Sequence, residues 1–305
     1  MRVHRFFRFF RYLNIATLRE VLIRSAHQRL PGLAAEIAFN ATLAMFPAIV
    51  ALLTAIGMLG SSQQAFDQLI NQLGRVAPEE VLGLIQGFIQ EISRSSSQSL
   101  FSISFIASLW IASGAISAAM NALDEIHQIP VAQRRAFWKS KLVSLALTIG
   151  TLMLMLVASI TLLISDWIVQ LVASQSDQLV ETIAKRPNIM EPQLLRLWQR
   201  LSLPLALGLV ALAFGFIYRF GLSRWKKGTP ILSGAVLSTV FWALLSSLFR
   251  LYVRNFGSYN RIYGALGAVM ILLVWLQLGA LVMLIGAQLN AVVGEAMRRQ
   301  KPTLT

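Results

Sequence analysis

The chain of 305 residues contains no cysteine, so disulfide bonds and thiolate chemistry are excluded. Charge is also scarce, because only 13% of the residues are Asp, Glu, Lys or Arg. Six stretches of at least 18 residues carry no charged residue: Ala41–Gly60, Leu100–Leu123, Leu142–Ser165, Leu201–Tyr218, Ile231–Phe249 and Ile262–Gly294. A helix needs about 20 mostly apolar residues to cross the hydrocarbon of a bilayer. This pattern therefore predicts a membrane protein.

The uncharged stretches also lack the alternation of apolar and polar residues that is typical of a membrane β-barrel. Backbone polar groups in lipid must be bonded within their own segment, which favours helices. The sequence predicts an all-α polytopic membrane protein, a six-helix transmembrane bundle with amphipathic N-terminal and external interfacial helices. We expect a membrane domain at 33–294, a cytoplasmic N-terminal segment at 1–32 and a cytoplasmic tail at 295–305. The spans are predicted at about 33–60, 100–123, 142–165, 201–219, 230–249 and 264–294.

Acidic residues are few: the chain has 13 Asp and Glu against 27 Lys and Arg, a formal net charge of +14. All 27 basic residues fall outside the six uncharged stretches, and 18 of them fall on one side of the predicted bundle. Cytoplasmic loops carry an excess of Lys and Arg, so this side, which includes both termini, is predicted to be cytoplasmic. The surplus indicates topology and contact with lipid headgroups. We find no nucleic-acid-binding module and expect no nucleic-acid partner.

Segments outside the spans have their own patterns. Residues 1–13 place Arg at every third position with aromatic residues between, which predicts an amphipathic helix at the cytoplasmic headgroups. The alternative is a basic topology anchor. Residues 61–99 show apolar residues at helical spacing and predict two half-buried external helices. The external segment 166–200 has weak periodicity and is expected to be a loop.

Enzyme signatures are missing from the sequence. The three histidines, His4, His27 and His127, are scattered, and no HExxH, GxSxG or Walker A pattern occurs. No span supplies a set of nitrogen and oxygen ligands for a metal ion. The glycines lie in hydrophobic stretches rather than in loops that could cradle a phosphate. We therefore predict that the protein is not an enzyme and holds no metal or cofactor.

Polar side chains near or within the predicted spans are candidates for a substrate path. Glu36 and Asn40 share one helix face, and polar residues spaced by four follow the second span. Polar and ionisable groups in lipid are costly and often functional. The alternatives are a solvated helix end for Glu36 and helix packing for the others. Pro47 is predicted to kink the first span. The path candidates are Glu36, Asn40, Ser113, Ser117, Asn121 and Asn290.

Arginines at both edges of the bundle are candidates for binding an anionic headgroup. Arg250, Arg254 and Arg261 stand in the last external region without an acid nearby, against the positive-inside trend. Arg134 and Arg135 occupy the short cytoplasmic loop after the second span. Arg can bind phosphate through two parallel hydrogen bonds. The alternatives are snorkelling of the external arginines to headgroups and simple ion pairing of the cytoplasmic pair.

Several motifs resemble one family of membrane proteins. Gly32–Phe39 and Leu43–Pro47 resemble the first span of the YihY/BrkB proteins. Phe256–Gly267 and Leu284–Asn290 resemble their last span, and Phe137–Lys139 is similar to the segment after their second span. The final motif is specific, and the first is moderately so.

The resemblance covers roughly residues 20–296 and implies a six-span inner-membrane protein with cytoplasmic ends and a role in moving lipids. The family once carried a ribonuclease label, generally regarded as an error, and has no defined catalytic set. Gln288 stands where many members have an acid, which weakens a proton relay there.

We expect a transporter or flippase-like protein for an anionic lipid or another amphipathic molecule, not a ribonuclease. The alternative is a non-transporting membrane scaffold or envelope-integrity protein. The expected partners are membrane lipids, with a second copy of the chain or an unknown envelope protein as further options. A groove open to lipid and lined by the polar path candidates would favour transport, whereas seams filled by neighbouring helices would favour the scaffold.

Overall fold

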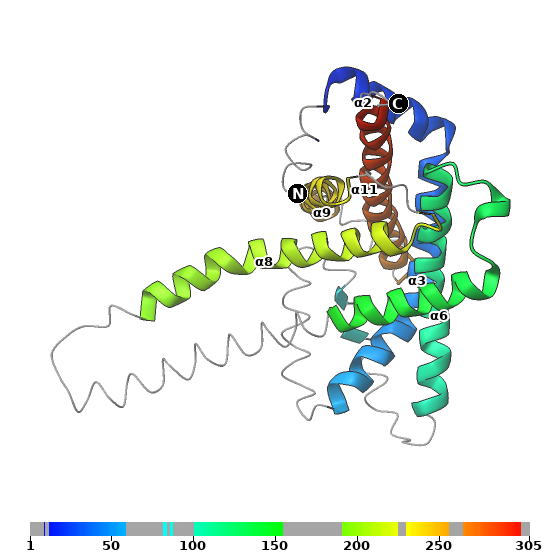
Figure 1. Ribbon diagram of the computed structural model, residues 1–305. Helices are drawn as coiled ribbons and strands as arrows, with labels where there is room; N and C mark the ends of the chain where they lie inside the picture. The colour runs from blue at the N-terminus through cyan, green and yellow to red at the C-terminus, as the bar shows by residue number, and fades with distance from the viewer. Residues whose placement is uncertain are drawn as a thin grey trace, which may run out of the picture.

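A computed structural model of the chain describes the following residues: 9, 12–58, 82–83, 86–87, 101–154, 191–224, 230–255 and 265–299. All regular elements in these ranges are helices (Figure 1), which confirms the predicted all-α class for the described part of the chain. The helix predicted over 1–13 and the external helices predicted over 61–99 lie outside the described residues, apart from isolated positions.

Two consecutive helices, α2 (Ile15–His27) and α3 (Leu30–Met58), form the N-terminal part. Asn14 caps α2, since its side-chain oxygen accepts a hydrogen bond from the Thr17 amide at 2.8 Å. The chain then turns at Arg29, whose φ of 53° lies in the left-handed region. Only Gln28 and Arg29 separate the N-terminal helix from the helix of the first predicted span.

The second predicted span is α6 (Phe101–Ile126), which packs against α3. After it, a positive φ of 51° at Gln128 and a short 3-10 turn, η1 (Val131–Gln133), redirect the chain. A further helix is described over Phe137–Leu154. Small residues allow helix backbones to approach closely, and the buried parts of α3 and α6 are rich in them: Ala34, Ala38, Ala44, Ala112, Ala118, Ala119 and Ala122.

The C-terminal half begins with α8 (Glu191–Phe220). This helix starts ten residues before the predicted fourth span, so the predicted loop over 166–200 is wrong for residues 191–200. Pro192 lies in the first turn of α8, where its missing N–H removes no helical hydrogen bond. The residues that follow include three leucines and no glycine, and they continue the helix into the span.

Two further helices complete the chain, α9 (Leu232–Asn255) and α11 (Ala265–Arg299). α9 continues past the predicted end of the fifth span, which confirms that Arg250 and Arg254 lie on its helical extension. α11 has 35 residues, about 52 Å at 1.5 Å per residue. Both helices therefore exceed the roughly 30 Å of a bilayer's hydrocarbon core.

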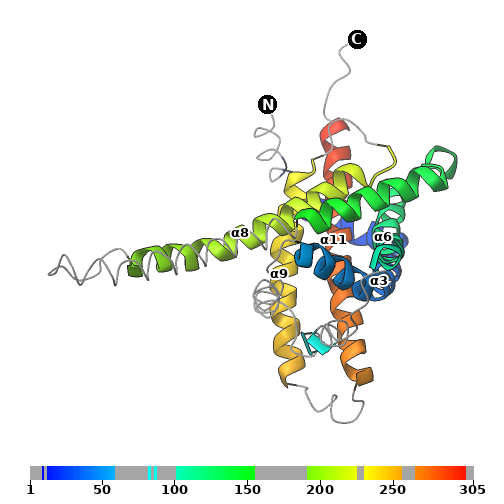
Figure 2. The same ribbon diagram turned by 90° about the horizontal axis from the view of Figure 1, so that it is seen from below.

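Several of the described helices cross one another steeply. In Figure 1, α6 runs from top to bottom, α8 and segment 137–154 run from side to side, and α9 is seen nearly end-on. Figure 2, turned by 90°, shows α6 end-on, whereas α9 and α11 both run from top to bottom. α11 contacts α2, α3, α6 and α9 and is the central element. This arrangement leaves the predicted six-helix bundle unconfirmed.

Helix is described at all six predicted spans, although parts of some spans lie outside the described residues. By length and composition, three helices within the described part of the chain can cross a membrane: Phe137–Leu154, Leu232–Arg254 and Gly267–Arg299. Leu30–Met45 and Leu207–Phe220 are shorter apolar segments. Membrane crossing by the other predicted spans, and the orientation of the termini, stay predictions.

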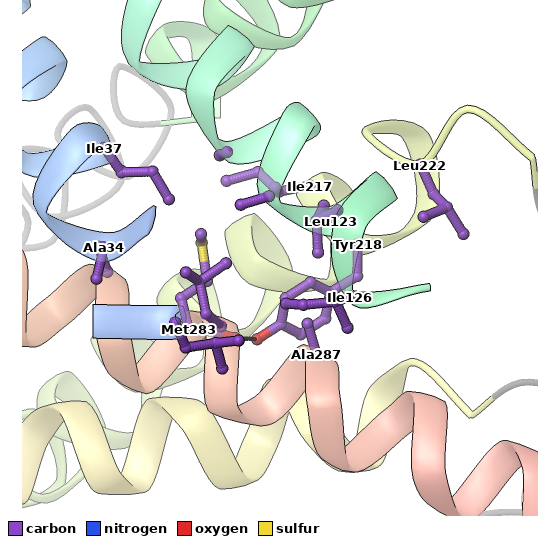
Figure 3. Close-up of a cluster of buried hydrophobic side chains, with 14 of the residues drawn as sticks. Ala34, Ile37, Leu123, Ile126, Ile217, Tyr218, Leu222, Met283 and Ala287 are labelled. Atoms are coloured by element: carbon purple, nitrogen blue, oxygen red, sulfur yellow. Dashed lines mark hydrogen bonds between the residues drawn. The ribbon is translucent and has the colours of Figure 1, made fainter. Parts of the chain in front are cut away.

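The main core lies where α3, α6, α8 and α11 meet (Figure 3). Leu30, Leu123 and Leu284, from three of these helices, have no exposed surface. A second cluster, which includes Val21 and Val293, packs α2 on the C-terminal part of α11. The two clusters place the ends of several helices close together, and most of the buried polar contacts lie around them.

Candidate functional site: polar helix joints and apolar cavities

A buried polar joint holds α8, α9 and α11 together. The Tyr218 hydroxyl on α8 donates a hydrogen bond to the carbonyl oxygen of Met283 on α11 at 2.5 Å (Figure 3). It also lies 3.0 Å from Ser238 Oγ on α9, and Ser238 Oγ donates to the Val282 carbonyl oxygen at 3.3 Å. Tyr218 and Ser238 are almost fully buried. Because both hydroxyls are bonded, the joint avoids the cost of buried unpaired polar groups.

Glycine makes this joint sterically feasible. A Cβ added to Gly286 on α11 would overlap Ser238 Oγ, and it would lie 2.9 Å from both the Gly234 carbonyl oxygen and the Tyr218 hydroxyl. Real Cβ atoms essentially never approach other heavy atoms this closely. α9 and α11 can therefore cross at this distance only because residue 286 has no side chain.

Asn290, a predicted path residue, takes part in the same helix crossing. Its Oδ1 accepts a hydrogen bond from the Gly234 amide at 3.0 Å, and its Nδ2 donates to the Ile231 carbonyl oxygen at 3.4 Å. The amide of Gly234 lies in the first turn of α9, which has no partner within the helix. Asn290 therefore caps α9 from α11, and this contact belongs to the packing alternative raised by the sequence.

A second polar joint ties the end of α6 to the end of α8. Asp124 is buried, and its two oxygens accept hydrogen bonds from the Ser223 amide at 2.8 Å and the Ser223 hydroxyl at 2.5 Å. Arg135 donates to the carbonyl oxygens of Phe220, Gly221 and Leu222 at 3.0, 2.8 and 2.7 Å. Phe220 is the last residue of α8 and the other two follow it directly, so no later turn of the helix supplies amides for these carbonyls. Arg135, a predicted headgroup ligand, thus serves as a helix cap here.

Two other basic residues on the predicted cytoplasmic side also have polar partners: Arg134, which is a headgroup candidate, and Arg24, which is not. Arg134 Nε donates to the Ile129 carbonyl oxygen at 3.1 Å. Arg24 on α2 pairs with Glu20 at 2.8 Å and with Glu295 of α11 at 2.9 Å. Partial burial opposes the charge of Arg24, but the hydrogen bonds from the two carboxylates outweigh it and raise the pKa of Arg24. The two ion pairs contribute fully to the stability of the fold while the pH is below the ordinary arginine pKa. Their contribution from Arg24 therefore persists through neutral and mildly alkaline pH.

The candidates on α3 and the middle of α6 do not converge on one groove. Glu36 is exposed, and Asn40 donates to its own helix at the Glu36 carbonyl oxygen at 2.9 Å. Ser117 is half-buried and Asn121 is exposed. Ser113 is fully buried and donates to the Trp110 carbonyl oxygen at 2.7 Å. The polar line on the second span therefore runs from a buried contact to an exposed face.

On the predicted external side, Arg254 is exposed on the last turn of α9, and Arg250 is half-buried. Arg261 lies outside the described residues. Pro47 lies within α3, but its side chain is outside the described part, so the kink stays a prediction. Within the described ranges, no group of three or more His, Cys, Asp or Glu residues could hold a metal ion.

Two adjacent apolar cavities lie where the helices cross. The Trp242 cavity, about 260 Å³, is lined by Trp242, Trp275 and parts of α3, α6, α8 and α11. The Thr148 cavity, about 310 Å³, is lined by α3, α6, α11 and residues Thr148 and Thr151. The two share wall residues, among them Trp275, so they are neighbours. Glu36, Asn40 and Ser117 are not on either wall.

A third apolar space, of about 410 Å³, is a groove between α9 and α11. Its floor includes Ser238 and Gly286 of the polar joint, and its rim on α9 includes Phe241, Leu244 and Leu248. These three rim side chains are 52%, 55% and 61% exposed. The groove therefore opens to the surroundings of the protein along an apolar helix face, where lipid chains would lie.

Comparison with known proteins bears on what these features serve. Residues 21–304 match the family described as Virulence factor BrkB. This chain belongs to that family. The match confirms the resemblance seen in the sequence motifs and makes the chain a membrane protein of the BrkB family. No solved structure matches it.

The curated relatives of this BrkB-family protein carry little functional information. "Putative ribonuclease-like protein YfkH" of Bacillus subtilis is 24% identical over 276 residues, 90% of this chain and 94% of the relative. "UPF0761 membrane protein VV0203" of Vibrio vulnificus is 26% identical and spans 92% of this chain and 83% of its own. A "UPF0761 membrane protein" of Tolumonas auensis is 26% identical over 294 residues, 91% of this chain and 87% of the relative. The ribonuclease-like name belongs to the first relative alone among these three.

Sequence reasoning missed Tyr218, Ser238 and Lys141 as contributors to polar contacts. Gly234 and Ser238 are four residues apart, a small-residue spacing that marks a helix face for close packing. That signal was available in the sequence. Tyr218 and Lys141 stand at the ends of uncharged stretches, where an anchoring role at the membrane surface is the ordinary expectation. Their interhelical partners cannot be inferred from spacing along one helix.

Proposed function

We propose that this BrkB-family protein moves an anionic lipid, or an amphipathic molecule of similar shape, across or out of the membrane. The observation that carries the proposal is the open apolar groove between α9 and α11. A path for an amphipathic molecule must accept an apolar chain from the lipid phase while a polar headgroup stays near charged groups. The groove and the arginines at the end of α9 supply these two elements.

The groove has the dimensions of a site for one lipid chain. Its lining on α9 extends from Leu237 to Leu248, which is about 16 Å along a helix. Half of the hydrocarbon core of a bilayer is about 15 Å. A chain from one leaflet could therefore lie along the groove for most of its length.

Arg254 is suitably placed for the headgroup. It is exposed, and it follows Leu248 by about 9 Å along the axis of α9. A guanidinium at this position can donate two parallel hydrogen bonds to a phosphate. Under the predicted topology, this end of α9 is external, so the headgroup would come from the outer leaflet.

The scaffold function remains the second candidate, and the polar joints favour it. Asn290, Tyr218 and Asp124 are all engaged in contacts between helices. They hold the helix ends together, and none of the three lines the α9–α11 groove, the Trp242 cavity or the Thr148 cavity. These contacts support a packing role for the three residues, but they leave the α9–α11 groove open. The two candidates therefore differ in what the groove does.

Transbilayer movement of a fluorescent phosphatidylglycerol in reconstituted phosphatidylcholine vesicles tests the proposal. The protein should accelerate the appearance of the probe in the opposite leaflet, measured by quenching with an impermeant reductant. Leu244→Trp, which enlarges a side chain on the groove rim, should slow this movement. Val240→Trp is the matched control, because Val240 lies one turn away on α9, is 47% exposed and does not line the groove.

Three outcomes are informative. If protein-containing vesicles move the probe no faster than empty vesicles, lipid movement by the protein alone is refuted and the scaffold is favoured. If Leu244→Trp moves lipid as the unsubstituted protein does, the groove is not the route. Equal slowing by both tryptophan substitutions would indicate a general effect on α9 rather than blockage of the groove.

A further inference from the structure

Lys141 lies in an unexpected place. The charge pattern assigns it to a cytoplasmic loop, but segment 137–154 crosses α6 (Figure 1). This crossing brings Lys141 against Trp110 and Ser113. α6 extends over Phe101–Ile126, so these two contact residues are near its middle rather than at its cytoplasmic end. If α6, rather than segment 137–154, crosses the bilayer at this point, the ammonium group lies well inside the membrane region.

The surroundings of the ammonium group hold it in one position. Lys141 Nζ donates hydrogen bonds to the Trp110 carbonyl oxygen at 3.0 Å and to Ser113 Oγ at 2.6 Å. It also lies 4.5 Å from the centre of the Trp110 ring, within the range of a cation–π interaction. Two of the three N–H donors of a lysine are thereby used. The third remains for another acceptor.

No acidic residue neutralises this charge within the described ranges, since both ion pairs found there involve Arg24. A charged side chain at membrane depth is costly and usually pairs with an opposite charge or faces a functional interior. The carbonyl oxygen and the hydroxyl reduce this cost but carry no net charge. The charge of Lys141 is therefore unbalanced in the described part of the protein.

An apolar cavity lies on the same two helices. The Thr148 cavity is lined on α6 by Ala112 and on the crossing helix by Thr148 and Thr151. Ala112 is the neighbour of Ser113, and Thr148 follows Lys141 by two helical turns. Lys141 itself does not line this space of about 310 Å³, but it lies on the same helix as the Thr148 wall, about 10 Å along the axis.

We propose that Lys141, with Ser113 and Trp110, binds the anionic group of an amphipathic molecule whose apolar chain enters the Thr148 cavity. The anionic group is a phosphate or a carboxylate, because one ammonium donor with an uncompensated charge suits either. This site rests on the proposed function and gives it a second binding position, separate from the α9–α11 groove. It also distinguishes anionic from zwitterionic lipids, which the apolar groove does not.

Equilibrium lipid binding, measured by native mass spectrometry of protein in an uncharged detergent, tests the site. The probes are phosphatidylglycerol, phosphatidylcholine of the same chain length and inorganic phosphate. Lys141→Gln should weaken phosphatidylglycerol binding about tenfold, the size expected for one hydrogen bond to a charged group. It should leave phosphatidylcholine binding unchanged, and Lys141→Arg should retain the preference for phosphatidylglycerol.

Lys139→Gln is the matched control, because Lys139 is an exposed lysine two residues away on the same helix. Equal binding by Lys141→Gln and the unsubstituted protein would overturn the proposal, as would an equal loss in both glutamine variants. If inorganic phosphate, which has no apolar chain, displaces phosphatidylglycerol, the site binds a free anion, and the proposal of an amphipathic ligand is overturned. Phosphatidylglycerol binding that phosphate does not displace supports it.

The absence of cysteine allows a test that separates charge from fold. Lys141→Cys can be labelled with aminoethyl methanethiosulfonate, which restores an ammonium group, or with the neutral methyl reagent. Only the first label should restore phosphatidylglycerol binding. Should neither variant fold, a photoreactive phosphatidylglycerol on the unsubstituted protein should cross-link to the Ala112–Ile116 peptide, and cross-linking elsewhere would overturn the site. A protein that binds at Lys141 but moves no lipid would refute only the proposed function.

Discussion

Substitution of Gly286 by Ala tests how closely α9 and α11 cross. The new Cβ would overlap Ser238 Oγ and approach the Gly234 carbonyl oxygen and the Tyr218 hydroxyl to 2.9 Å, so α9 must move outward or the hydroxyls must give up their bonds. Overpacking costs about 1–3 kcal/mol, and one lost hydrogen bond adds about 1 kcal/mol. The higher helix propensity of Ala returns about 1 kcal/mol. We therefore expect a loss of about 1–3 kcal/mol in the free energy of unfolding.

The measurement is unfolding in mixed micelles by titration with sodium dodecyl sulfate, followed by circular dichroism. Gly208→Ala on α8 is the matched control, because an added Cβ there meets nothing within 4 Å. It should stabilise the protein by about 0.5–1 kcal/mol. In a Ser238→Ala background, Gly286→Ala should cost less, since the overlapping oxygen is gone. A neutral or stabilising effect of Gly286→Ala in the unsubstituted protein would refute the close crossing.

Two further substitutions test the polar joints by the same unfolding assay. Asp124→Ala removes both acceptors of the Ser223 hydrogen bonds and should lower the free energy of unfolding by about 2–4 kcal/mol. Glu125→Ala, on the exposed side of the same helix, is the control and should change it by less than about 0.5 kcal/mol. Equal effects of the two substitutions would show that the Asp124–Ser223 contact does not stabilise the protein. Asn290→Ala should cost about 1–2 kcal/mol through loss of its bonds to α9 and leave lipid movement unchanged. Lost movement at unchanged stability would make Asn290 a path residue.

The positions of the helices could be predicted because uncharged apolar stretches of this length have few other structures in lipid. Their ends could not, since a helix continues beyond the membrane wherever the sequence allows it. α8 begins at Glu191 because Pro192 suits a first turn, and α9 reaches Asn255 because arginine is a good helix former. An uncharged stretch marks the part of a helix that can lie in the hydrocarbon of the bilayer, and this part is shorter than the whole helix.

Candidate site residues were found by their polarity and spacing, but their partners were not. Asn290 bonds to Gly234, 56 residues away, and Arg135 bonds to carbonyl groups 85–87 residues away. Helical spacing predicts which residues share a face, whereas the helix that covers this face depends on the crossing geometry. For Arg135 the structure adds a helix-cap contact, and headgroup binding stays a prediction.

Lys141 shows that charge counting does not predict how deep in the membrane a residue lies. The positive-inside rule counts lysines near the ends of spans as loop residues, and it assigns them to a side of the membrane without a depth. The connection over residues 127–136 carries the chain back along α6, so that the next helix begins beside the middle of α6 (Figure 1). No local pattern in these ten residues predicts that return, so the contact with Ser113 could only come from the structure.

The distribution of polar contacts and cavities bears on where the protein could move. Tyr218 and Asp124 bind the C-terminal end of α8 to α11, α9 and α6, so that end is held by hydrogen bonds to three helices. The rim of the α9–α11 groove, in contrast, is formed by exposed apolar side chains that make no such bonds. Apolar contacts with lipid and with protein are similar in strength in a bilayer, so they resist separation less than hydrogen-bonded joints do. A carrier built on this fold would therefore open along α9 and pivot at the joints, whereas a scaffold would need a partner to cover that rim.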